Sequence, residues 1–198
     1  MSTIQIKMIG GAVLVASLLS AGGALSDDVR KQVMFNDKMP NVSEIEGTLF
    51  PDGIKKGAEE CKALVDAGLK CGSVIPKASM ETTLVTFERG SANLTDQSKL
   101  FLDRVGTALK NRKDSFVNVV VEGHTDATGS KDGNRTLSKK RAESVKAYLS
   151  ANYGISNVET VGRASDMLKD KANPAAAINR RIEFVVSLPG QEKAPSQQ

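Results

Sequence analysis

VEGHTDATGSKDGNRTLSKKR, residues 121–141, is the stretch that decides the fold. It follows an apolar run that starts at Phe116, crosses a polar loop over residues 124–133, and enters an amphipathic segment that continues to about Asn152. A strand, a loop and a helix in this order hold polar side chains at one edge of a sheet. We therefore expect the functional site in this loop and at the start of the helix.

Arg141 breaks the amphipathic pattern of the predicted helix. At about 100° per residue, the apolar side chains fall within an arc of about 140°. They are Leu137, Ala142, Val145, Tyr148 and Leu149. Arg141 lies inside this arc, whereas the other charged side chains of the segment lie opposite. Because a guanidinium on an apolar face is costly unless its donors are paired, Arg141 requires a specific partner.

The expected partner lies in the loop before the helix. Helical side chains lean toward the helix N-terminus, so Arg141 should point toward Thr125 and Asp126. Two interpretations follow from this placement. Asp126 and Arg141 form an internal salt bridge, or they stand apart and hold a zwitterion, with Asp126 binding the ammonium and Arg141 the carboxylate. The pattern does not choose between them.

Three motifs in order resemble a known family. They are G-H-T-D-x-x-G at residues 123–129, N-x-x-L-S-x-x-R-A-x-x-V at 134–145 and N-R-R-I-E at 179–183. Together they resemble the OmpA-like peptidoglycan-binding domain, the family of the C-terminal half of OmpA, the Pal lipoproteins and the periplasmic part of MotB. The resemblance covers residues 82–186. It implies non-covalent binding of the stem peptide of the cell wall.

The resemblance also implies roles for single residues. In the family, the Asp of H-T-D and the Arg of L-S-x-x-R-A receive the free amino-acid end of diaminopimelate. Those roles fall on Asp126 and Arg141, which favours the ligand clamp over the internal salt bridge. Asn134 matches an Asn that helps to hold the bound peptide, and as a loop residue it is also suited to cap the helix.

Further contacts are expected around the clamp. Thr125 is positioned to present its backbone or hydroxyl to the ligand. Phe87 lies where the first strand of the family reaches the pocket, although a core position is the commoner role for a phenylalanine. Asn179 and Arg180 open the last strand near the same edge, where a supporting or peripheral contact is expected.

The sequence departs from the family pattern at two places. Gly133 stands where the family has an aromatic residue before the Asn. Residues 161–165, VGRAS, lack the usual G-x-G and the following Pro. We therefore expect the outer wall of the pocket to differ from the family while the clamp is retained.

The predicted fold is α+β. Alternating strands and helices indicate a mixed sheet with helices on one face, which agrees with the two-layer βαβαβ-type sandwich of the family. The expected strands lie at residues 83–88, 115–121, 157–161 and 181–187. Thr95 is expected to open a helix that buries Leu100, Phe101, Val105 and Leu109. The strand at 115–121, apolar on both faces near its end, should lie in the interior of the sheet.

The chain is expected to have four parts. Residues 1–26 are typical of a secretory signal, because Lys7 is the only charge before a long uncharged stretch. An uncleaved N-terminal anchor is the alternative. Residues 27–78 form a separate short region, residues 79–187 the peptidoglycan-binding domain, and residues 188–198 a disordered tail.

The region 27–78 is expected to be helical and to contain a disulfide. Ser43-x-x-Glu46 resembles a capping box, which would start a short helix ending near Phe50. Cys61 and Cys71 are the only cysteines, and a pair in an exported protein favours a disulfide. An unbroken helix would separate their Cα atoms by about 15 Å, so the chain must turn back between them. A metal site is the weaker alternative, because two Cys and one distant His do not make a usual zinc set.

The predicted function is a non-catalytic tether. The protein would bind peptidoglycan in the periplasm, associated with the outer membrane, and residues 27–78 would contact other envelope proteins. One alternative is a membrane-anchored component of a stator or secretion machine. Another is a wall hydrolase with His124 as base and Asp126 as orienting acid. No cofactor is expected, and nucleic acid is excluded as a partner because the net charge of +4 is not gathered in a basic block.

Overall fold

The computed structural model describes residues 31–51, 63, 66–67 and 78–187. The predicted signal or anchor, the Cys61–Cys71 pair and the predicted tail lie outside the described residues and stay predictions. Within the described ranges, no helix is both long enough and apolar enough to cross a membrane.

The described strands form one mixed five-stranded sheet in the order β1-β2-β5-β3-β4. Along the chain the elements are β1 (Lys31–Phe35), α1 (Val42–Leu49), β2 (Ala78–Thr82), α3 (Asp96–Asn111), the 3-10 turn η1 (Lys113–Ser115), β3 (Asn118–His124), α4 (Lys131–Tyr153), β4 (Val158–Ala164), the 3-10 turn η2 (Ala177–Asn179) and β5 (Ile182–Ser187). Strand β5 is antiparallel to both of its neighbours, whereas the pairs β1–β2 and β3–β4 are parallel. The prediction of a mixed sheet, and of β3 as an interior strand, is confirmed.

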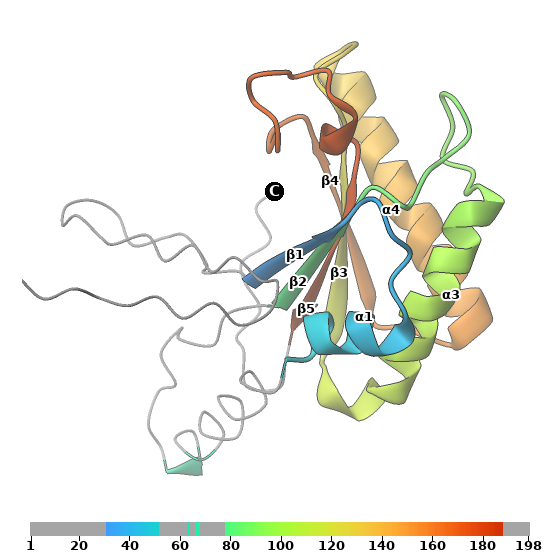
Figure 1. Cartoon of the computed structure of the whole chain (residues 1–198), viewed down its shortest axis with the longest axis vertical. Helices are drawn as coiled ribbons and strands as arrows, with labels where there is room; N and C mark the ends of the chain where they lie inside the picture. The colour runs from blue at the N-terminus through green and yellow to red at the C-terminus, as the bar shows by residue number, and fades with distance from the viewer. Residues whose placement is uncertain (1–30, 52–62, 64–65, 68–77, 188–198) are drawn as a thin grey trace, which may run out of the picture.

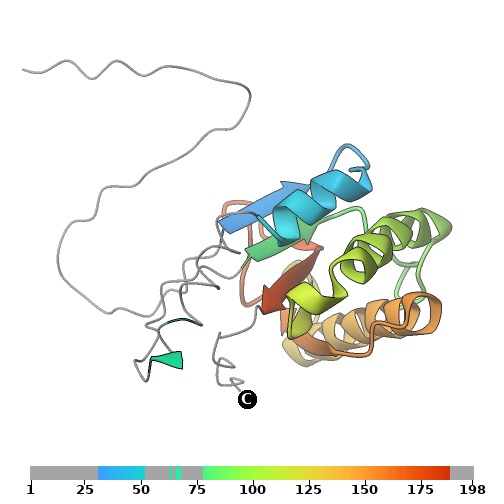
Figure 2. The same cartoon turned by 90° about the horizontal axis from the view of Figure 1, so that it is seen from below.

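Helices α1, α3 and α4 cover one face of this sheet, as both views show (Figures 1 and 2). The apolar core lies between the two layers. Phe101 of α3, Phe184 of β5 and Leu149 of α4 are fully buried there. The predicted two-layer arrangement is therefore present.

The fold takes in residues 31–51, which the sequence placed in a separate region. Strand β1 pairs with β2, with Val33 opposite Met80. Ile45 and Leu49 of α1 are fully buried in the same core as the rest of the domain. The domain start predicted at residue 79 is therefore corrected, because the first strand and helix belong to the same sheet and core.

The capping box of α1 differs from the prediction by two residues. Asn41, not Ser43, is the N-cap: its side chain accepts a hydrogen bond from the Glu44 amide at 2.9 Å. The Glu44 carboxylate in turn accepts from the Asn41 amide at 2.7 Å. Asn41 and Glu44 have the same spacing as Ser43 and Glu46, so the spacing alone does not show which pair forms the capping box. The predicted end of this helix near Phe50 is confirmed.

The strand predicted at residues 83–88 is wrong. Strand β2 ends at Thr82, opposite the first residue of β5, Ile182, and residues 83–88 form only an isolated bridge, between Phe87 and Leu94. Val85 nevertheless turns into the core and is only 3% exposed. The alternation of apolar residues therefore predicted burial correctly but not strand pairing.

Helix α3 begins where the sequence predicts. The Thr95 side chain is the N-cap and accepts from the Ser98 amide. Phe101, Val105 and Leu109 are fully buried, whereas Leu100 is 58% exposed. The predicted burial of Leu100 is wrong because it lies about 140° around the helix from Val105, which is near the middle of the buried stripe.

Helix α4 packs closely on the sheet because two paired glycines lie under it. Gly123 of β3 and Gly162 of β4 are opposite each other. A methyl group on Gly123 would lie 2.2 Å from the Ser138 carbonyl oxygen. Helix α4 begins at Lys131, three residues before the expected start, with Ser130 as its N-cap. It ends at Tyr153, and the C-cap Gly154 has a left-handed φ of 69°.

Candidate functional site

The candidate site lies at the end of β3, where three segments meet. The loop after β3, the segment between β2 and α3, and the segment between β4 and β5 all lie at the end of the sheet where α4 begins (Figure 1). A pocket of about 350 Å³ opens among them. Its lining includes Phe87, His124, Arg141, Arg180 and Arg181.

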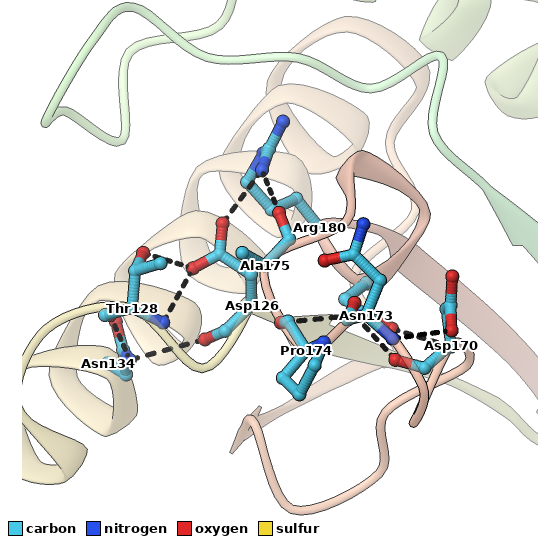
Figure 3. Close-up of polar contacts among 9 residues, drawn as sticks. Asp126, Thr128, Asn134, Asp170, Asn173, Pro174, Ala175 and Arg180 are labelled. Carbon is cyan, nitrogen blue, oxygen red and sulfur yellow. Dashed lines mark hydrogen bonds and ion pairs between the residues drawn. The ribbon is translucent and has the colours of Figure 1, made fainter.

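Asp126 is held in the loop after β3 by contacts on both carboxylate oxygens. Its Oδ1 accepts from the Thr128 amide at 3.0 Å and from the Thr128 hydroxyl. Its Oδ2 accepts from the Arg180 guanidinium at 2.7 Å. Figure 3 shows Asp126 between Thr128 on one side and Arg180 on the other. The carboxylate is therefore pre-positioned, and one of its partners is an arginine.

These contacts keep Asp126 ionised. Burial alone raises the pKa of the Asp126 carboxyl, but the hydrogen bonds from Thr128 and Arg180 outweigh it, and the pKa lies below its ordinary value of 3.8. The side chain is only 10% exposed. At neutral pH the Asp126 carboxylate is therefore negatively charged, and only a small part of its side chain is accessible to a ligand.

Arg141 does not form a salt bridge with Asp126. Its Nε donates to the Ser91 carbonyl at 3.3 Å, and its guanidinium lies 4.9 Å from the centre of the Phe87 ring. Among the described residues, no carboxylate lies within ion-pair distance of Arg141. The internal salt bridge, one of the two interpretations of the sequence, is therefore wrong, and Phe87 has a definite role as the platform for Arg141.

The charge environment of Arg141 favours an anion. Burial lowers the pKa of the Arg141 guanidinium, the nearby Arg180 lowers it further, and Asp126 acts in the opposite direction. A half-buried guanidinium with no carboxylate partner is costly. A bound carboxylate would supply the missing counter-charge and a matching pair of acceptors.

The segment that holds Arg141 is a short turn. Phe87 pairs with Leu94 in an isolated antiparallel bridge, and the Glu88 amide donates to the Asn93 carbonyl at 3.0 Å. Gly90 occupies the turn with φ of 67°, a left-handed conformation that suits glycine. This turn presents the Ser91 carbonyl to Arg141.

Asn179 organises the segment that carries Arg180. It is fully buried, and its Oδ1 accepts from the amides of Lys169 and Asp170 at 2.8 and 2.9 Å. Its Nδ2 donates to three carbonyls of the same segment, including that of Pro174. The Pro174 carbonyl also accepts from the Ala127 amide, which ties this segment to the loop of Asp126. The expected supporting role of Asn179 thus has a structural basis.

Asn134 and Thr125 hold the loop after β3 in place through hydrogen bonds. Asn134 lies in the first turn of α4 and donates to the carbonyls of Thr128 at 2.8 Å and Asp126 at 3.3 Å (Figure 3). It does not cap the helix, because Ser130 has that role. The Thr125 amide donates to the Ala164 carbonyl at 2.9 Å, and Thr125 is buried. A direct ligand contact from either residue stays a prediction.

His124 belongs to a buried polar cluster. Its Nε2 lies 3.8 Å from Glu183, and the potential ligand atoms of Glu122, His124 and Glu183 lie within 4.8 Å of one another. Arg163 neutralises Glu122 through hydrogen bonds of 2.6 and 2.9 Å. The hydrolase interpretation paired His124 with Asp126, but the Asp126 carboxylate contacts Thr128 and Arg180 instead. That pairing is therefore wrong.

A second hollow lies beside Gly133, where the sequence departs from the family. It measures about 540 Å³, and its lining includes Gly90, Ser91, Gly133 and Lys140. An aromatic side chain at residue 133 would occupy space near this hollow. The expected change in the outer wall thus falls beside the Ser91 carbonyl that contacts Arg141.

Besides the ion pair between Asp126 and Arg180, two further contacts of the candidate site were not predicted from the sequence. Thr128 contributes two hydrogen bonds to Asp126, and the signal for it was the Asp-x-Thr spacing, since an Asp side chain commonly accepts from the amide two residues later. Ser91 supplies a backbone carbonyl to Arg141. No side-chain pattern signals a backbone contact between segments 50 residues apart.

Comparison with known proteins gives consistent relatives. A model of the OmpA family matches residues 86–181. The chain is 35% identical over 121 residues to outer membrane protein Omp38 of Acinetobacter baumannii, an alignment that covers 56% of this chain and 33% of that protein. It is 30% identical over 124 residues to the peptidoglycan-associated lipoprotein of Pseudomonas aeruginosa, covering 60% of this chain and 71% of that protein.

Among solved structures, the peptidoglycan-associated lipoprotein of Burkholderia pseudomallei is similar with a TM-score of 0.44 and 28% identity, covering 52% of this chain and 88% of that chain. The chain spans only about a third of the length of Omp38. It spans more than two thirds of the Pseudomonas lipoprotein, to which it is 30% identical. This chain belongs to the OmpA family.

Proposed function

We propose that this protein binds peptidoglycan non-covalently and so tethers the cell envelope to the wall. The pocket would receive the free amino-acid end of diaminopimelate in the stem peptide. Asp126 would bind its ammonium and Arg141 its carboxylate. The periplasm, in association with the outer membrane, is the compartment in which such a tether meets its ligand.

The observation that carries the proposal is that Arg141 has no ion pair with any carboxylate of the described residues. Its Nε contacts a backbone carbonyl and its face contacts Phe87, so its remaining donors are left for a ligand. Asp126 lies at the same end of the sheet and is held ionised by Thr128 and Arg180. One fixed positive and one fixed negative group match the two charges of an amino-acid end.

Two relatives support peptidoglycan as the source of that ligand. One is named a peptidoglycan-associated lipoprotein. Another, 36% identical over 107 residues, is the peptidoglycan-binding protein ArfA of Mycobacterium tuberculosis. We propose that the role is binding without catalysis, since the Asp126 carboxylate that a hydrolase would need beside His124 is engaged with Thr128 and Arg180.

Co-sedimentation of the full chain with purified sacculi tests the proposal. Asp126→Asn and Arg141→Gln each remove one charge of the clamp, and each should lower the affinity by about thirtyfold or more, the loss expected when one partner of a desolvated charge pair is removed. Asp114→Asn and Arg135→Gln, which remove the same charges at exposed positions, serve as matched controls and should bind as the original chain does.

Two results would contradict the proposal. Equal losses in the control variants would mean that net charge, not the clamp, governs retention on sacculi. Soluble fragments released from sacculi by the original chain, but not by His124→Gln, would show that the protein cuts the wall.

A further inference from the structure

Arg180 occupies the pocket side of Asp126. The Oδ2 atom of Asp126 accepts from Arg180 at 2.7 Å, while Oδ1 is engaged by Thr128. Arg180 lines the 350 Å³ pocket, whereas Asp126 and Thr128 are not among the lining residues, so Arg180 lies between Asp126 and the pocket. An ammonium that approaches Asp126 through the pocket therefore meets the Arg180 guanidinium on the oxygen that it needs.

The side chain of Arg180 is free to exchange, whereas its backbone is held. The Arg180 side chain is 47% exposed, while that of Asp126 is 10% exposed, so water reaches the arginine side of the pair and the pair is weaker than a fully buried one. Its NH1 group also donates to the Ala175 carbonyl at 3.3 Å (Figure 3). The Arg180 amide donates to the Ala177 carbonyl, beside the buried Asn179. Arg180 can thus leave Asp126 without disturbing the segment that carries it.

The arginines of the pocket repel one another in the absence of ligand. Arg181 is balanced by Glu81, at 3.0 Å. Arg180 is paired with Asp126, and its positive charge disfavours that of the nearby Arg141, which has no ion pair with a described carboxylate. A ligand that brings only an ammonium would displace Arg180 and add a third cation. A ligand that also brings a carboxylate would neutralise Arg141 in the same step.

We propose that Arg180 is an internal counter-ion that the ammonium of the ligand displaces from Asp126, and that this exchange restricts the pocket to ligands carrying a carboxylate beside the ammonium. The inference rests on the proposed function and deepens it. Asp126 binds the ammonium of the ligand and Arg141 binds its carboxylate. The ammonium must displace Arg180 before it can bind Asp126.

Calorimetry with two soluble ligands tests this role. One is the wall tripeptide L-alanyl-γ-D-glutamyl-meso-diaminopimelate, and the other is the same tripeptide with the carboxylate next to the free ammonium converted to the amide. Arg180→Gln should bind the free acid about two- to fivefold more tightly than the original chain does, the range expected when an exposed ion pair no longer competes. The preference for the free acid over the amide should shrink in the same variant.

Arg135→Gln is the matched control, because Arg135 is similarly exposed at 50% and paired with Asp166 outside the pocket. It should leave both affinities unchanged. Weaker or unchanged binding of the free acid by Arg180→Gln would overturn the exchange, since Arg180 would then be a direct ligand contact or a bystander. If the original chain binds neither tripeptide, the proposed function itself fails, and that result is distinct from binding that Arg180→Gln weakens.

Discussion

The two faces of the sheet are both buried but are built from opposite chemistry. On the helix side, Phe184 of β5 lies between Met80 of β2 and Val121 of β3. On the other side, one residue earlier, Glu183 lies between Glu81 and Glu122. Each of these side chains is at most 2% exposed. Because successive side chains of a strand point to opposite faces, the apolar core and the row of carboxylates lie on opposite faces of the same strands.

The carboxylate row is balanced by cations from the C-terminal part of the chain. Arg163 of β4 pairs with Glu122, while Arg181 and Lys169 pair with Glu81. Lys169 lies in the segment that leads to Arg180. The comparison teaches that the apolar face supplies the stability of the fold, whereas the charged face holds the segment that reaches Asp126.

The largest expected effect comes from the apolar face. Phe184→Ala should lower the free energy of unfolding by about 3–5 kcal/mol, because a fully buried aromatic ring is lost and a cavity remains. Urea denaturation monitored by circular dichroism measures it. Leu100→Ala, at a position 58% exposed, is the control and should change stability by less than about 0.5 kcal/mol. Similar losses in both variants would mean that the helix-side face is not the main source of stability.

A smaller loss is expected on the charged face. Arg163→Met should lower the free energy of unfolding by about 1–3 kcal/mol, because Glu122 would stay buried without its guanidinium partner. The double variant Arg163→Met with Glu122→Gln should recover most of that loss, since removing both charges avoids the uncompensated carboxylate. The same denaturation experiment measures both. Additive losses in the double variant would show that the two charges do not depend on each other.

The smallest effect is expected where the site meets solvent. Asp126→Asn should cost about 1 kcal/mol at pH 7, the usual net value of such hydrogen bonds. Because the folded pKa of Asp126 lies below 3.8, its contribution is complete above pH 3.8 and is lost as the pH falls through the lower folded value. Carboxyl NMR titration of the folded chain measures this pKa. A value at or above 3.8 would contradict the contacts with Thr128 and Arg180.

Particular residues show how far the sequence reaches. Arg141 stood out because it lies on an apolar helical face, and the structure gives it the special surroundings that this implied. Asp126 was expected near Arg141 from the lean of helical side chains, and the resemblance implied its ligand role; the structure pairs it with Arg180. The ion pair of Asp126 with Arg180 was not predicted, because the two residues are 54 positions apart and only packing brings them together.

The errors have a common cause. Residues 83–88 alternate as a strand does, yet β2 ends at Thr82, opposite the first residue of β5, Ile182. Residues 31–51 carry no family motif, yet they complete the sheet and the core. Local periodicity reports which side chains are buried, whereas strand pairing and domain limits depend on segments that are distant in the sequence.

The sequence by itself determined the two-layer architecture, helix α4 with Arg141 on its apolar face, and the family. These depend on periodicity and on short motifs, which are local properties of the chain. Only the tertiary structure decided that Asp126 pairs with Arg180 and that Arg141 rests on Phe87 and Ser91. The physical reason is that a charged side chain has several candidate partners in the sequence, and the packing of segments selects the one that comes within reach.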